Sequence, residues 1–75
     1  MEIKFSRHAK RRAKLYRISE PTIVDILRGA NLQQGKNEII KNVVGFKYPL
    51  KVIAVVDRGL TTVISSYPLK KGRKK

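Results

Sequence analysis

The sequence has no cysteine, a single histidine and only five acidic residues among 75. Without cysteine it can form no disulfide framework, zinc–thiolate site or cysteine nucleophile. The five carboxylates are scattered along the chain, so with one histidine they offer no spacing suited to a metal ion. No glycine-rich phosphate loop is present either. We therefore expect a protein that uses no metal and no cofactor.

Long apolar runs are also missing. The longest, Val52 to Val56, is far shorter than the roughly 20 residues that cross a bilayer. Met1 is followed by Glu2-Ile3-Lys4, which does not resemble the apolar core of a signal peptide. We expect a cytoplasmic protein with no membrane association. Its length predicts one globular domain, residues 1–69, followed by a flexible basic tail, residues 70–75.

Basic residues, in contrast, are abundant. Eighteen Lys and Arg against five Asp and Glu give a formal net charge of +13. Segment 4–17 carries seven basic residues and no acidic one, and segment 70–75 carries five basic residues. Concentrated positive potential attracts polyanions, chiefly RNA, DNA or an anionic membrane surface. Simple solubility is the alternative interpretation of this charge.

The pattern of apolar residues predicts an α+β fold with the order β-α-α-β-β-β. We expect a strand over 2–6, a helix over 7–17 capped by Ser6, and a second helix capped by Ser19 that ends near Gly29. Strands are expected over 38–44, 50–56 and 61–67, with a tight turn at Asp57-Arg58-Gly59. This order suggests two helices packed on one face of a small antiparallel sheet. The non-alternating run 52–56 suggests that both faces of its strand are covered.

The first predicted helix carries its charge along one side. At about 100° per residue, five basic side chains fall within a sector about 120° wide. Such a stripe can follow a phosphate backbone, and Lys70 and Lys71 of the tail can add to the contact. A solvated surface is the alternative. We call these five residues the basic stripe: Arg7, Lys10, Arg11, Lys14 and Arg17.

The remaining arc of this helix holds Ala9, Ala13, Leu15 and Tyr16, together with His8 and Arg12. That mixture is too polar to insert into lipid. His8 can act as a general acid or base, or it can be a buried structural residue.

Arg12 lies one turn after His8 and can hold a phosphate, pair with Asp25 or Asp57, or bury its stem. Tyr67, at the end of the last predicted strand, can stack on a base or donate a proton. Alternatively, its ring packs in the core and its hydroxyl reaches water.

The segment from His8 to Gly29 reads HAKRRAKLYRISEPTIVDILRG. It resembles a family of small bacterial and archaeal proteins known as domain of unknown function 4258, in which an HA-x-x-R helix is followed by R-x-I-S/T and V-x-x-x-L. The family's closing V-V-T-V-Y-P strand is similar to Val63-Ile64-Ser65-Ser66-Tyr67-Pro68. One departure is visible, because the family's usual R-G before the isoleucine is Tyr16-Arg17 here.

That family looks like part of the RelE/ParE-type toxin group, whose members include messenger-RNA endonucleases, gyrase poisons and proteins without demonstrated activity. The resemblance implies a toxin-like RNA-binding domain, either free or associated with ribosomes. It also implies a metal-independent endoribonuclease as one activity, with His8, Arg12 and Tyr67 as the catalytic candidates. The alternatives are a non-catalytic nucleic-acid-binding module and an interaction protein that docks an acidic antitoxin or forms a homodimer.

Overall fold

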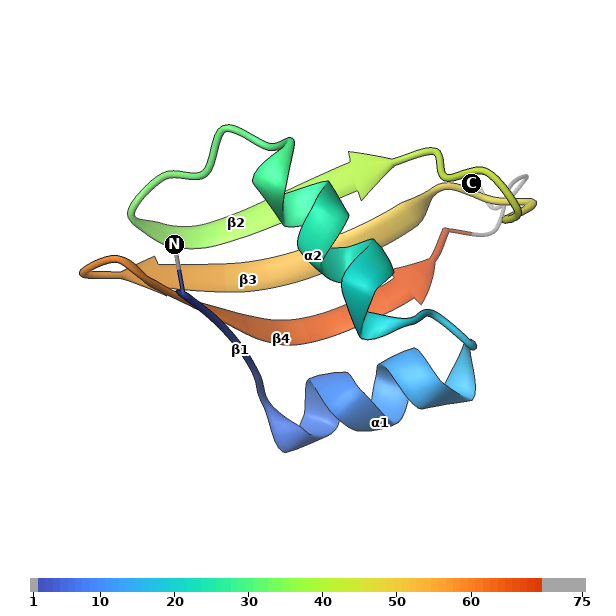
Figure 1. Ribbon diagram of the computed structural model, residues 1–75, viewed down its shortest axis with the longest axis horizontal. Coiled ribbons are helices and arrows are strands. Elements are labelled where there is room, and N and C mark those ends of the chain that lie inside the picture. Colours follow the sequence, from blue (N-terminus) through green and yellow to red (C-terminus); the bar gives the residue numbers. More distant parts are fainter. Residues whose placement is uncertain (1, 70–75) are drawn as a thin grey trace.

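The order of elements confirms the predicted α+β class and the β-α-α-β-β-β succession (Figure 1). The computed structural model describes residues 2–69, so the predicted basic tail, with Lys70 and Lys71, lies outside the described residues. The elements are β1 (Glu2–Phe5), α1 (Arg7–Leu15), α2 (Glu20–Arg28), β2 (Gly35–Lys41), β3 (Leu50–Asp57) and β4 (Leu60–Pro68).

The four strands form one mixed sheet in the order β1-β4-β3-β2. β2 and β4 each pair with β3 in antiparallel fashion, but β1 pairs with β4 in parallel, from Glu2 opposite Leu60 to Phe5 opposite Val63. The prediction of a wholly antiparallel sheet is therefore wrong. The parallel pairing is possible because of the connection between β1 and β2. The two helices carry the chain from one edge of the sheet to the other, and a crossover of that length allows parallel strands.

The hairpin between β3 and β4 confirms the predicted tight turn. Asp57 pairs with Leu60, so only Arg58 and Gly59 lie between the strands. Both have a positive φ, 53° and 82° respectively. This is the backbone of a type I′ turn, whose twist matches that of the strands it joins.

The hydrophobic core lies between the helices and one face of the sheet. On β3, Leu50, Val52 and Ala54 are fully buried on this side, and both helices contribute buried residues to the same cluster. α2 crosses in front of the sheet, while α1 lies along β4 beside the end of β1 (Figure 1). The alternate residues of β3, Ile53 and Val55, remain partly exposed. The expectation that both faces of this strand are covered thus does not hold within the single chain.

We call the face away from α2 the open face. Strand pairing places Glu38 opposite Ile53, Ile40 opposite Lys51, and Lys51 opposite Tyr67. These residues alternate with the buried ones, so they lie on this second face.

α1 ends at Leu15, two residues before the predicted end. Arg17 has a φ of 58°, in the left-handed region. The Ile18 N–H donates to the Ala13 carbonyl at 2.8 Å, and the Arg17 N–H donates to the Lys14 carbonyl at 3.2 Å. These two bonds form a Schellman motif, in which glycine is the usual left-handed residue. Arg17 therefore belongs to the turn after α1 and not to the helix.

This turn generates a stability prediction. Replacing Arg17 with glycine removes the steric cost of a side chain in the left-handed region, so we expect Arg17→Gly to raise the free energy of unfolding by about 0.5 to 1 kcal/mol. Urea titration measures the change. The matched control is Arg11→Gly, which removes the same charge inside α1 and is expected to lower stability by about 1 kcal/mol. An Arg17→Gly variant no more stable than the wild type would contradict this account of the turn.

Candidate nucleic-acid interface

The start of α1 is fixed to β4 by Ser6. Its N–H donates to the Val63 carbonyl at 3.0 Å, and its hydroxyl donates to the Ile64 carbonyl at 3.3 Å. The same hydroxyl oxygen accepts the Ala9 N–H at 3.0 Å, as an N-cap does. Because these bonds meet at one residue, they set both where α1 begins and the direction in which it runs along β4.

Two alanines set which side of α1 faces the sheet. Ala9 and Ala13 are 0% and 3% exposed, and they are the buried residues of the helix. Their small side chains allow the helix backbone to lie close to its neighbours. The opposite side of α1 therefore projects into solvent over its whole length.

All five residues of the basic stripe are exposed. Four of them, Arg7, Lys10, Arg11 and Lys14, lie on α1 itself, and Arg17 follows the end of the helix. Both ion pairs found within residues 2–69 involve Glu38, on β2, so none neutralises the stripe. The like charges four residues apart destabilise the helix by about 0.2–0.5 kcal/mol per pair. The positive potential of this surface is thus not compensated locally.

The sequence placed Leu15 in the same arc of the helix as Ala9 and Ala13, but in the structure Leu15 does not lie on the buried side. Leu15 is 66% exposed, so most of its surface is open to solvent. The buried arc is centred on Ala9 and Ala13, and Leu15 falls well outside it at 100° per residue. Leu15 is therefore an exposed apolar residue beside the cationic residues of α1.

His8 is exposed in the first turn of α1, so it is not the buried structural residue that one interpretation expected. Arg12, one turn later, is partly buried, and its guanidinium donates to the Tyr16 hydroxyl at 3.4 Å. Within residues 2–69 Arg12 makes no ion pair with Asp25 or Asp57. The Arg12 guanidinium thus bonds to Tyr16, one turn further along α1, while His8 lies one turn before Arg12.

Tyr16 is a site residue that the sequence interpretation missed, since it was assigned only to the apolar arc. The signal was available in the spacing, because Arg12 and Tyr16 are four residues apart and such pairs face each other on a helix. The Tyr16 hydroxyl therefore helps to orient the Arg12 guanidinium.

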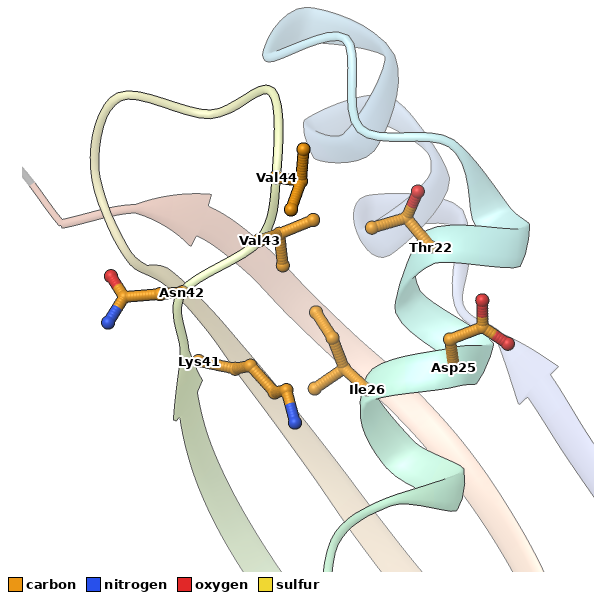
Figure 2. A pocket seen from close by; sticks show the side chains of 7 residues that line it. All are labelled: Thr22, Asp25, Ile26, Lys41, Asn42, Val43 and Val44. Carbon is orange, nitrogen blue, oxygen red and sulfur yellow. The ribbon is translucent and has the colours of Figure 1, made fainter.

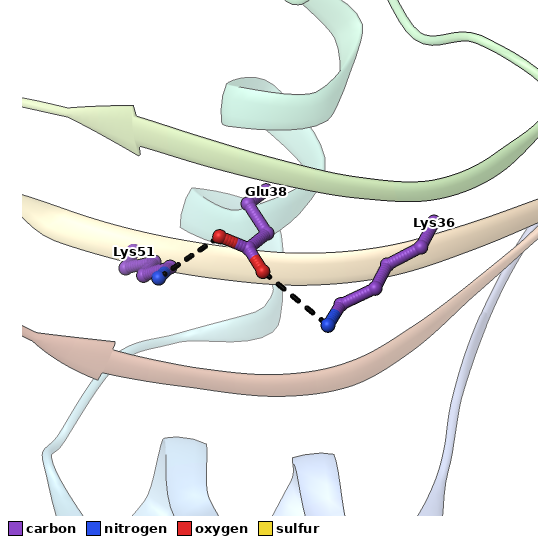
Figure 3. Close-up of polar contacts among 3 residues, drawn as sticks. All are labelled: Lys36, Glu38 and Lys51. Carbon is purple, nitrogen blue, oxygen red and sulfur yellow. Dashed lines mark ion pairs between the residues drawn. The ribbon is translucent and has the colours of Figure 1, made fainter.

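Tyr67 lies on the open face, next to a network of charges. Glu38 accepts from Lys51 at 3.1 Å and from Lys36 at 3.3 Å (Figure 3). The hydrogen bond from Lys51, followed by that from Lys36, lowers the pKa of the Glu38 carboxyl. Glu38 in turn raises the pKa of Lys51, with smaller contributions from Tyr67. The positive charge of these lysines is therefore partly balanced, unlike that of α1.

The three catalytic candidates are not brought together in one cluster. α1 and β4 run in the same direction from the bond between Ser6 and Val63 (Figure 1). His8 is two helical residues from that point, about 3 Å, whereas Tyr67 is four strand residues away, about 13 Å. Tyr67 is thus displaced from His8 by about 10 Å along the shared direction. His8 and Arg12 are one turn apart on α1, and Tyr67 lies on the open face of the sheet.

Two grooves flank α2. One, of about 400 Å³, lies between α2 and the segment that follows β2 (Figure 2). The other, of about 540 Å³, lies between α2 and β1, with Ile3 and Phe5 among its lining residues. Neither groove is lined by His8, Arg12 or Tyr67. In the described part of the chain no group of three potential metal ligands comes together.

No helix of residues 2–69 has the length and apolar character needed to cross a membrane. No protein-family model, curated protein or solved structure matches this chain. The similarity to domain of unknown function 4258 and to the RelE/ParE group therefore remains a prediction from the sequence. Among the surfaces described, the exposed side of α1 combines uncompensated positive charge with the candidate residues His8 and Arg12.

Proposed function

We propose that this protein is a cytoplasmic, RelE/ParE-like domain that binds RNA through the exposed side of α1. The observation that carries the proposal is the basic stripe: its side chains are exposed, four of them lie along one side of α1, and none has an ion-pair partner within residues 2–69. Binding a polyanion would release counterions and relieve the repulsion among these cations. RNA is favoured over DNA by the resemblance of the sequence to a toxin group that includes messenger-RNA endonucleases.

The hydrogen bonds at the two ends of α1 support this role over a merely solvated surface. The helix is fastened at its start by Ser6 and at its end by the Schellman bonds of Ile18 and Arg17. A helix held at both ends has a defined backbone, from which its cationic side chains project. A backbone that is already ordered loses less freedom when these side chains contact phosphates, which favours binding.

The basic stripe predicts a strong dependence of binding on salt. If about four cations neutralise phosphates of a single strand, the logarithm of the affinity should fall with the logarithm of the salt concentration with a slope of about −3. Replacing Lys10, Arg11 and Lys14 by glutamine should bring the slope about two units closer to zero. Fluorescence anisotropy with a labelled oligoribonucleotide measures both quantities.

The matched control replaces Lys36, Lys41 and Lys47 by glutamine. These exposed lysines lie on β2 and in the loop that follows it, and removing them takes away the same charge. We expect this control to keep most of the wild-type slope. Equal losses in the two triple variants would show that net charge alone, and not α1, determines binding.

A second candidate function is metal-independent cleavage of RNA. It is favoured by the exposed His8 one turn from Arg12, whose guanidinium Tyr16 orients. His8 would take the proton of a ribose 2′-hydroxyl, and the 2′-oxygen would attack the adjacent phosphorus. The bond from phosphorus to the 5′-oxygen would break, leaving a cyclic phosphate and a 5′-hydroxyl. Arg12 would stabilise the charge that develops on the phosphoryl oxygens.

In this mechanism the departing 5′-oxygen needs a proton. Tyr67 was the candidate donor, but its displacement from His8 along β4 favours a lysine of the basic stripe, on the same helix as His8. Tyr67, beside Lys51 on the open face, can still contact a more distant part of the RNA.

Incubation with RNA in a chelator tests cleavage directly. If His8 is the general base, His8→Ala should slow cutting by roughly 10²- to 10⁴-fold while RNA binding persists. Tyr16→Phe, which removes only the hydroxyl that orients Arg12, should slow it less. No cutting by the wild type, alone or with ribosomes, would exclude the endoribonuclease and leave the non-catalytic binding module.

A further inference from the structure

The exposed side of α1 carries two parallel columns of different chemistry. At about 100° per residue, each column of three side chains fits within a sector about 60° wide, and the two column centres are about 100° apart. We call the first the cationic column: Arg7, Lys10 and Lys14. We call the second the stacking column: His8, Arg11 and Leu15.

The stacking column differs from an ordinary charged helix surface. His8 and Arg11 have flat side chains that can lie against a base, and all three residues of the column are exposed. The Arg11 guanidinium keeps its positive charge when it stacks, so Arg11 still contributes to the basic stripe. Leu15, 66% exposed, adds apolar surface at the end of the column. A single exposed leucine needs no explanation by itself. Here, however, Leu15 is aligned with the His8 imidazole and the Arg11 guanidinium, and this column lies beside three cations that can bind phosphates. Such a surface is suited to a ligand that has both flat apolar surfaces and negative charge.

We propose that the stacking column contacts unpaired bases while the cationic column follows the backbone, so that single-stranded RNA is the preferred partner. This inference rests on the proposed RNA-binding function. From His8 to Leu15 the helix rises about 10 Å, which corresponds to about three stacked bases at 3.4 Å each. The column therefore fits a short run of two or three nucleotides.

A duplex does not satisfy both columns. It offers phosphates to the cationic column, but its base faces are covered by stacking, and the deep major groove of A-form RNA is closed to side chains. Single strands can turn their bases outward and lay them on flat or apolar side chains. The two columns thus predict that the protein distinguishes single-stranded from double-stranded RNA by the accessibility of the bases and not by charge.

The test compares one oligoribonucleotide of 10 to 12 nucleotides with its perfect duplex at a single salt concentration. We expect the wild type to bind the single strand at least about fivefold more tightly, since burial of part of Leu15 contributes roughly that factor. Leu15→Ala should lose about fivefold in affinity for the single strand and keep its affinity for the duplex. Alanine has the highest helix propensity of all residues, so α1 is expected to remain folded in this variant. Circular dichroism verifies this.

Two further variants separate apolar contact from charge and from general surface effects. Leu15→Lys should gain affinity for the duplex and lose the preference for the single strand. Ile40→Ala truncates a similarly exposed residue, 59%, on the open face and should change neither affinity. Equal binding of both forms by the wild type, or an unchanged single-strand affinity in Leu15→Ala, would overturn the inference while leaving RNA binding intact. Absence of binding to either form would instead refute the proposed function and the inference with it.

Discussion

Ser6 joins β1, α1 and β4 at a single point, and the proposed RNA-binding surface depends on that junction. Its backbone N–H and its hydroxyl bond to consecutive carbonyls of β4, and the hydroxyl oxygen also caps the helix. Because β1 ends one residue earlier, α1 continues beside β4 where the edge strand stops (Figure 1). Ala9 and Ala13 then turn one side of the helix inward. Every exposed cation of α1 owes its direction to this arrangement.

The distribution of charge follows from a shortage of carboxylates. Of five acidic residues, Glu38 alone makes ion pairs within residues 2–69, and it does so with Lys36 and Lys51 near the open face. α1 carries five basic residues, and it has no acidic residue in its first turn to interact favourably with the helix macrodipole. α1 is therefore less stable than an ordinary charged helix, and a bound polyanion would offset that loss.

Local signals in the sequence were sufficient for much of the fold. Ser6 and Ser19 were predicted as N-caps and both accept a backbone N–H at the start of their helices. The turn at Asp57-Arg58-Gly59 was likewise visible, because short turns depend on nearby residues. The parallel pairing of β1 with β4 was not, since it joins segments far apart in the chain. The end of α1 was missed because Arg17 adopts a backbone conformation that usually signals glycine.

The candidate site was predicted in part. The basic stripe could be found from helical periodicity alone, whereas the exposure of His8 and Leu15 depends on where the two alanines direct α1. The contact of Tyr16 with Arg12 could have been found from their spacing of four residues, whereas the separation of Tyr67 from His8 depends on the packing of α1 against β4. The contact of Lys51 with Glu38 required the strand register, which no local pattern specifies.

The most direct test of the central claim is chemical-shift mapping by nuclear magnetic resonance during titration with a short single-stranded oligoribonucleotide. If the exposed side of α1 is the RNA-binding surface, the largest amide shifts should fall in residues 6–17, and the strands of the open face should change little. Shifts centred instead on Lys51 and Tyr67, or on the grooves beside α2, would contradict the account.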